Sequence, residues 1–130
     1  MNINSAMKSS AAALSVERLR MDVISGNIAN ANSTETAEYR PFRRKEVLVA
    51  GNSEGPRVLQ VQEDTTTPFR KVYMKGHPQA DSEGYVEATN SEPILEMVNM
   101  LSASRAYEAN VTAFNTAKNM AKSALQIGKV

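Results

Sequence analysis

The feature that most limits how this chain can fold is a long helical repeat in its last third. Between positions 97 and 125, candidate seam residues recur at alternating intervals of three and four. This spacing is that of a heptad continued for about four repeats, and it is typical of a helix that packs along most of its length. The seam consists of Met97, Met100, Ser104, Tyr107, Val111, Phe114, Lys118, Ala121 and Leu125.

The helix that this repeat predicts is too long for a compact domain. Residues 92–127 would span about 54 Å at about 1.5 Å per residue. A compact chain of 130 residues has a radius of gyration of about 14 Å, which makes it roughly 36 Å across. We therefore expect an elongated helix whose seam is completed in part by other chains. The alternative is an ordinary buried helix face.

Several residues suggest where this helix begins and ends. Asn90 and Ser91 carry side chains of the kind that cap a helix, and Gly128 is a typical stop. Glu92 and Glu96 suit the positive start of a helix dipole. We expect Asn90 and Ser91 to act as caps.

A shorter repeat occupies the start of the chain and predicts a second helix of about 25 residues, from position 5 to position 30. Asn4 or Ser5 is the expected cap. All five prolines lie between positions 41 and 93, so both ends of the chain are free of residues that break helices. The repeat, at intervals of seven, consists of Met7, Leu14, Met21 and Ile28.

The first helix ends in the stretch SGNIANANS, residues 25–33. Asn27 and Asn30 lie three residues apart, so both amides project from one side of the helix. One interpretation is a fraying helix end, where small and polar residues tolerate an irregular backbone. The other is a close helix contact whose register is fixed by amide hydrogen bonds. The residues alone leave both interpretations open.

The middle of the chain has the pattern of short strands and turns. Alternating apolar residues flank the turn GNSEGP (51–56) and predict a hairpin, and two further strands are expected at 70–74 and 85–88. The fold class is therefore mainly α: N- and C-terminal helices packed as an elongated antiparallel coiled-coil-like hairpin, with a small irregular β-containing middle region. The expected segments are 1–32, 33–90 and 91–130.

The composition excludes most kinds of catalytic and metal chemistry. The chain has no cysteine, and its one histidine, His77, lies in a Gly-His-Pro turn. No nucleotide-binding glycine motif and no calcium or zinc ligand pattern is present. We expect no enzyme activity, no metal, no cofactor and no small-molecule substrate. No run of about 18 apolar residues predicts a membrane span, and the first twenty residues predict no cleavable signal peptide.

One basic and aromatic cluster, YRPFRRK, allows a second hypothesis. Such a mixture can bind single-stranded nucleic acid by stacking and phosphate contacts. The net charge of the whole chain is only +1, which favours a solvated loop or a docking patch instead. The cluster consists of Tyr39, Arg40, Phe42, Arg43, Arg44 and Lys45.

Two stretches near the ends of the chain resemble the signatures of a known family. SGNIANANS resembles the N-terminal signature of flagellar axial proteins, which build the rod and hook, and EMVNMLSASRAYEANVTAFNTAK (96–118) resembles their C-terminal signature. YRPFRRKEV and GHPQADSEGYV (76–86) make the short proximal-rod members the most similar. Distal-rod and hook members carry a larger middle domain, for which residues 33–90 leave little room. ATNSEP (88–93) replaces a stretch that is commonly Pro-Asn-Val.

The resemblance implies a structural subunit of the proximal rod of the bacterial flagellar basal body. Such subunits assemble helically into the drive shaft that transmits torque and encloses the export channel. They leave the cytoplasm through the flagellar type III system without a cleavable signal peptide and assemble in the periplasm. The implied partners are the chain itself, other proximal and distal rod proteins, the junction between the rod and the MS ring, and the export apparatus. Nucleic acid is not among them.

The resemblance and the seam spacing together give a hypothesis about individual residues. The apolar seam residues of the two helices would pack against each other and against neighbouring subunits, and four asparagines would set the register. The segment from Tyr39 to Lys45 would be a further contact. The helix residues are Met7, Leu14, Met21, Asn27, Ile28, Asn30, Met97, Met100, Tyr107, Asn110, Val111, Phe114, Asn115 and Leu125.

Overall fold

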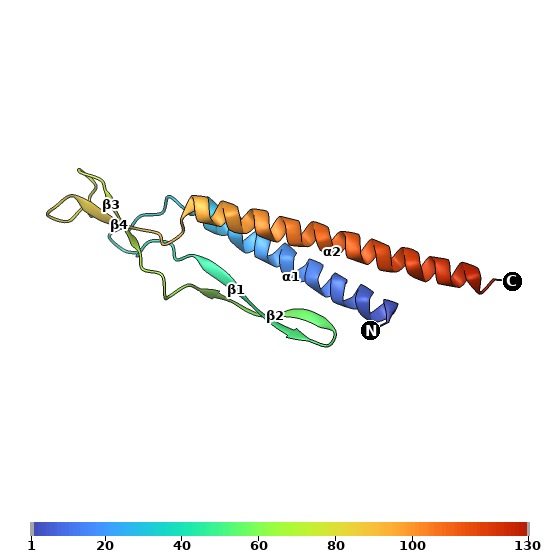
Figure 1. Ribbon diagram of the computed structural model, residues 1–130. Helices are drawn as coiled ribbons and strands as arrows, with labels where there is room; N and C mark the ends of the chain where they lie inside the picture. The colour runs from blue at the N-terminus through green and yellow to red at the C-terminus, as the bar shows by residue number, and fades with distance from the viewer. Residues whose placement is uncertain (1, 130) are drawn as a thin grey trace.

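The computed structural model describes residues 2–129, so Met1 and Val130 of the expected terminal segments lie outside the described part. Figure 1 shows an elongated molecule in which two helices run side by side in opposite directions. Two small antiparallel sheets form the middle of the chain, which confirms the mainly α class with a β-containing middle. The elements are α1 (Ile3–Ala29), β1 (Lys45–Asn52), β2 (Gly55–Glu63), β3 (Arg70–Tyr73), β4 (Tyr85–Ala88) and α2 (Pro93–Ile127).

Helix α1 begins earlier than the sequence predicted. Asn2, in an extended conformation, is the capping residue, and its Oδ1 accepts a hydrogen bond from the Ser5 backbone N–H at 2.7 Å. The prediction that Asn4 or Ser5 caps α1 is therefore wrong. The helix begins at Ile3, so the side chain of Asn2 is the one that reaches the free N–H groups of the first turn. At the other end, the Asn30 side chain donates to the backbone oxygen of Gly26 at 2.8 Å.

Helix α2 begins at Pro93 without a side-chain cap, and Glu92 precedes it. The prediction that Asn90 and Ser91 cap α2 is wrong, because both side chains bond to other segments. Proline at the first helical position lacks the N–H that a cap would otherwise satisfy. The predicted stop at Gly128 is confirmed, and its φ of −75° is right-handed.

Helix α1 lies between α2 and the β1–β2 hairpin and contacts both (Figure 1). On α2, the buried positions are Glu96, Ala103 and Ala117. Ala103 and Ala117 lie two heptads apart. Each lies one residue before an expected seam position, Ser104 or Lys118. Small alanine side chains let the backbone of α1 come closer than larger residues would. The face that α1 covers is therefore rotated relative to the predicted seam.

The predicted hairpin is confirmed, with β1 and β2 joined by a tight turn and a bulge next to Leu48 and Val49. Its turn lies against α1 at Gly55, which has a φ of +121°. A Cβ atom at this position would lie 2.9 Å from the Cα atom of Ser9. Only glycine allows both this backbone conformation and this close approach.

Strands β3 and β4 form the second antiparallel pair, at the end of the molecule beyond the hairpin (Figure 1). The segment that follows α1 lies along the other edge of β4. The backbone N–H of Glu35 donates to Glu87 O at 3.0 Å, and that of Thr89 donates to Ser33 O at 2.9 Å. The strands predicted at 70–74 and 85–88 are confirmed.

Candidate functional site

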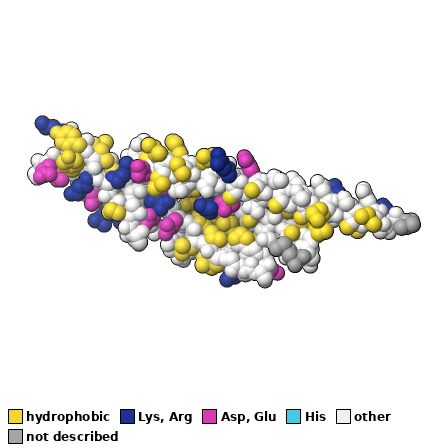
Figure 2. All heavy atoms as spheres, in the orientation of Figure 1, with side chains coloured by type: hydrophobic (Ala, Val, Ile, Leu, Met, Phe, Trp, Pro, Cys, Tyr) yellow, Lys and Arg dark blue, Asp and Glu magenta, His cyan; other side chains and the backbone are white. Residues whose placement is uncertain are grey.

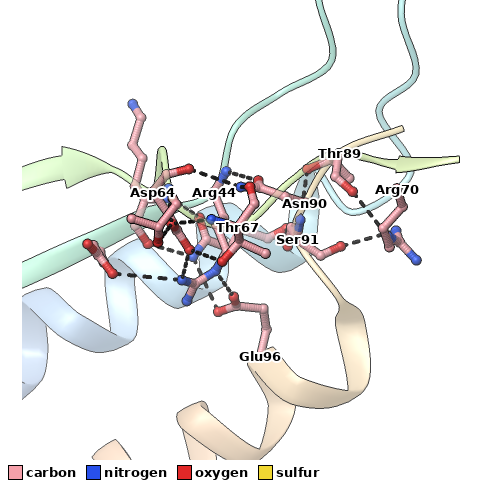
Figure 3. Close-up of polar contacts among 12 residues, drawn as sticks. Arg44, Asp64, Thr67, Arg70, Thr89, Asn90, Ser91 and Glu96 are labelled. Atoms are coloured by element: carbon pink, nitrogen blue, oxygen red, sulfur yellow. Dashed lines mark hydrogen bonds and ion pairs between the residues drawn. The ribbon is translucent and has the colours of Figure 1, made fainter. Parts of the chain in front are cut away.

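Two features of the structure are candidates for function. One is a group of buried polar side chains where the helices, the hairpin and the β3–β4 pair meet, which we call the polar junction (Figure 3). The other is a set of large apolar side chains on α2 that are exposed among the described residues. The first joins segments that lie far apart in the sequence, and the second is exposed to solvent.

Asn27 lies at the centre of the polar junction, with 1% of its surface exposed. Its Oδ1 accepts a hydrogen bond from the Lys45 N–H, and its Nδ2 donates to Lys45 O, both at 2.8 Å. The same Nδ2 lies 3.2 Å from Glu96 Oε2, and Ser91 Oγ donates to Asn27 O at 2.7 Å. The Asn27 amide thus fixes β1 and α2 against the end of α1 within one chain.

Arg44 carries the charge that balances two buried carboxylates. Its Nε donates to Glu96 Oε1 at 2.7 Å, and its Nη1 donates to Asp64 Oδ2 at 2.9 Å. The Glu96 side chain is 0% exposed and that of Asp64 is 5% exposed. Burial alone lowers the pKa of Arg44, but the hydrogen bonds to Glu96 and Asp64 outweigh it and raise that pKa above its ordinary value.

Asp64 also organises the loop that follows β2. Its Oδ1 accepts hydrogen bonds from the backbone N–H groups of Thr66 and Thr67, both at 3.0 Å. Burial alone raises the pKa of Asp64, but the hydrogen bonds from Thr67, Arg44 and Thr66 outweigh it and hold that pKa well below its usual range. The carboxylate is therefore charged at neutral pH.

The depressed pKa of Asp64 makes stability depend on pH. Because this pKa is lower in the folded than in the unfolded chain, the stabilisation is fully present above pH about 4 and is lost as the pH falls further. We expect the free energy of unfolding, measured by urea titration, to fall between about pH 4 and pH 2. Asp64→Asn should flatten this decline and Asp22→Asn, at an exposed position of α1, should not. An equal slope for both variants would contradict the assignment.

Arg70 and Asn90 tie together the three segments that lead to the β3–β4 pair. Asn90 Oδ1 accepts from the Arg44 N–H at 2.7 Å, and its Nδ2 donates to Asp64 O at 3.0 Å. Arg70 donates to the backbone oxygens of Thr89, Ser91 and Ala31. Within residues 2–129, every buried side-chain nitrogen or oxygen has a hydrogen-bond partner. The junction is thus a fully bonded joint.

Sequence reasoning missed most of this junction. The sequence pattern assigns Glu96 to the positive start of the helix dipole. It does not single out Asp64 or Arg70. The available signal was that Glu96 lies one heptad before Ala103 on the same face of α2. An acidic residue at such a position predicts a buried partner of opposite charge.

The basic and aromatic cluster is divided by the fold. Arg44 is held in the polar junction, and the guanidinium carbon of Arg43 lies 4.3 Å from the centre of the Phe69 ring. Arg40 lies 5.7 Å from the same ring centre. Phe42 is half-buried, whereas Tyr39 and the Lys45 side chain are exposed. The cluster therefore does not present a continuous basic surface.

The expected helix residues divide into two groups. One group is half-buried or buried, and the other is exposed. The first group is Met7, Leu14, Met21, Asn27, Ile28, Met100, Tyr107, Asn110, Val111 and Phe114, and the exposed group is Asn30, Met97, Asn115 and Leu125.

Large apolar side chains remain exposed at both ends of α2. Figure 2 shows hydrophobic side chains over the beginning of this helix and again toward its end. Contiguous apolar surface of this kind commonly marks a protein interaction site. The exposed residues are Ile94, Leu95, Met97, Val98, Leu101, Met120, Leu125 and Ile127.

The described residues contain neither a metal site nor a membrane span. Across positions 2–129, no three acidic or histidine side chains are grouped so that they could hold a metal ion. In the same range, neither helix combines the length and hydrophobicity that crossing a membrane requires.

Comparisons with known proteins agree on one family. Residues 7–37 match the family model described as "Flagella basal body rod protein", and residues 82–127 match "Flagellar basal body rod FlgEFG protein C-terminal". The flagellar basal-body rod protein FlgC of Bacillus subtilis is 39% identical, over 92% of this chain and 94% of the relative. FlgC of Borreliella burgdorferi is 37% identical over 98% of each chain. FlgC of Escherichia coli is 38% identical over 90% of this chain and 91% of the relative.

Proposed function

The chain belongs to the flagellar basal-body rod protein FlgC family and is a structural subunit of the rod rather than an enzyme; from this premise we propose that it assembles helically in the proximal rod. We propose that this rod is a periplasmic drive shaft that transmits torque and surrounds the export channel. The observation that carries the proposal is the exposed apolar surface at both ends of α2.

The two helices would form the wall of the rod as an antiparallel coiled-coil-like pair. Two columns of α2 residues support this packing. Ala103 and Ala117 form the buried column, and Met100, Tyr107 and Phe114 form the half-buried column beside it. Their spacing is heptad-like. Because α1 covers only this side of α2, neighbouring subunits would cover the other side.

The polar junction suits a subunit that carries mechanical load. Arg70 and Asn90 hold the three segments that connect the β3–β4 pair to the helices. Those bonds would transmit a force on the β3–β4 pair to the helices without a hinge. The Asn27 amide is used within the chain, whereas Asn30 and Asn115 are exposed and would set the register with neighbours.

The family supports interaction with other basal-body components, and the finer partners are part of our proposal. They are copies of this chain, other proximal and distal rod proteins, the junction of the rod with the MS ring, and the export apparatus. We propose that the chain reaches the periplasm through that apparatus. Neither the divided basic cluster nor any relative supports the nucleic-acid alternative.

The proposal is tested in a strain that lacks this chain. We expect no rod and no motility, and both should return when a tagged chain is supplied, with the tag at the rod base in purified basal bodies. Phe114→Asp should fail to restore them, because a carboxylate at this half-buried position would lose part of its hydration. Ser53→Asp, in the exposed turn of the β1–β2 hairpin, should restore them. A tag outside the rod base, or full motility with Phe114→Asp, would refute the proposal.

A further inference from the structure

The part of the basic and aromatic cluster that does not enter the polar junction lines a hollow on the surface. Arg44 turns inward to the junction, whereas Arg40, Arg43 and Lys45 surround a space of about 390 Å³, which we call the basic pocket. This volume lies at the lower end of the range found for ligand-binding pockets. The other lining residues are Pro41, Phe42, Glu63 and Phe69.

Two cations of the basic pocket share one aromatic ring. The guanidinium carbon of Arg43 lies 4.3 Å from the centre of the Phe69 ring, and that of Arg40 lies 5.7 Å from it. The ring attracts both side chains but does not neutralise their charges. Because like charges held close together repel each other, an anion bound beside them would lower the energy of the pocket.

The chain supplies no carboxylate that balances these cations. No ion pair among residues 2–129 includes Arg40, Arg43 or Lys45. Arg43 donates to the backbone oxygen of Asp64 at 3.1 Å, and a carbonyl group leaves the charge uncompensated. Glu63 is the one acidic residue in the lining. Three cations against one carboxylate leave the pocket with an excess of positive charge.

The backbone around the basic pocket is held in place by other segments. The Phe42 N–H donates to Ser33 Oγ at 2.9 Å, and the backbone N–H and oxygen of Lys45 both bond to the Asn27 amide. Pro41 is buried. A ligand would therefore not have to order this segment first, which lowers the entropic cost of binding.

The lining fits a short acidic protein segment better than a nucleic-acid backbone. Guanidinium groups match the geometry of carboxylates, and clusters of arginine commonly recognise acidic motifs. The half-buried rings of Phe42 and Phe69 offer apolar contacts to the side chains next to such carboxylates. A phosphate backbone would need positive charge over a longer surface, but the net charge of the whole chain is only +1.

From these observations we propose that the basic pocket binds a short acidic segment of a neighbouring basal-body protein. Carboxylates of this segment pair with Arg40, Arg43 and Lys45, and an apolar side chain next to them lies against Phe69. The inference rests on the proposed function, in which other basal-body components surround the chain. It adds the chemistry of one contact that lies outside the two helices.

A fluorescent peptide of alternating glutamate and phenylalanine tests the basic pocket on the full-length chain by fluorescence anisotropy. The matched control peptide carries glutamine in place of glutamate. We expect the acidic peptide to bind about tenfold more tightly than the control, since several exposed ion pairs contribute. Added salt should reduce this difference, because it screens exposed charges. Equal affinity for the two peptides would overturn the proposal.

Paired variants test whether the acidic peptide binds at this place. Arg40→Gln with Lys45→Gln removes two exposed charges of the pocket and should lower the affinity about tenfold, at about two- to fivefold for each charge. Arg57→Gln with Lys75→Gln removes the same charge at exposed positions outside the pocket and should change the affinity less than about twofold. Equal losses would show a response to net charge alone and would contradict the proposal.

Two further measurements separate this inference from its alternatives. A short oligothymidylate represents nucleic acid, and tighter binding of it than of the acidic peptide would overturn the proposal. In the strain that lacks this chain, the variant with Arg40→Gln and Lys45→Gln should restore less motility than the variant with Arg57→Gln and Lys75→Gln. If the acidic peptide does not bind while the tagged chain is found at the rod base, this inference fails and the proposed function stands.

Discussion

Arg44→Leu is expected to lower the free energy of unfolding by about 3–5 kcal/mol, the cost of removing one partner from a buried ion pair. The Glu96 side chain is fully buried and accepts from Arg44 Nε at 2.7 Å. Without the guanidinium, the Glu96 carboxylate would keep only the hydrogen bond from Asn27. The loss is therefore mainly the cost of an uncompensated buried charge.

Urea unfolding followed by far-ultraviolet circular dichroism measures this effect. Arg105→Leu, at an exposed position of α2, is the matched control and should change stability by less than about 0.5 kcal/mol. The double variant Arg44→Leu with Glu96→Leu should be more stable than Arg44→Leu alone, because it removes the isolated charge together with its partner. Equal stability of Arg44→Leu and Arg105→Leu would show that the ion pair is not formed.

The second large effect is expected for Asn27→Ala, which should cost about 3 kcal/mol, since it leaves two half-buried backbone groups without partners. These are the N–H and the carbonyl oxygen of Lys45, each 2.8 Å from the Asn27 amide. The first residue of β1 would lose its attachment to α1. Hydrogen exchange at the Lys45 amide should therefore become faster in this variant.

Asn30→Ala provides the control for Asn27, because the two residues lie in the same motif. The Asn30 side chain is exposed and bonds only to Gly26 O of its own helix. We expect a loss of less than about 1 kcal/mol, within the range for exposed positions and caps. A loss as large as that of Asn27→Ala would mean that the motif stabilises the helix end generally, as in the fraying interpretation.

The outcome for this motif illustrates how far sequence reasoning reaches. The positions of Asn27 and Asn30 on one side of a helix follow from their spacing. Which of the two is buried depends on β1 and α2, and Glu96 lies 69 residues from Asn27 along the chain. No local pattern reports a contact over that distance. No local pattern identifies Arg44 as the cation that pairs with Glu96 and Asp64.

The sequence by itself determined the secondary structure. Heptad spacing, the confinement of proline to positions 41–93, and the alternation around residues 51–56 act locally, because backbone preference and side-chain periodicity depend on near neighbours. Helix α2 from Pro93 to Ile127 and the strand from Tyr85 to Ala88 accordingly lie within one residue of where they were predicted.

Only the tertiary structure decided which face of α2 is covered and which remains free. A shift of one residue, from Ser104 to Ala103, moves one column of the seam by about 100° around the helix axis, while the predicted column of Met100, Tyr107 and Phe114 stays half-buried. The rotation depends on how closely the backbone of α1 can approach, and the small side chains of Ala103 and Ala117 permit it. This packing leaves Met97 and Leu125 in solvent. Heptad spacing predicts that a helix packs, but the size of the side chains on both helices determines the face.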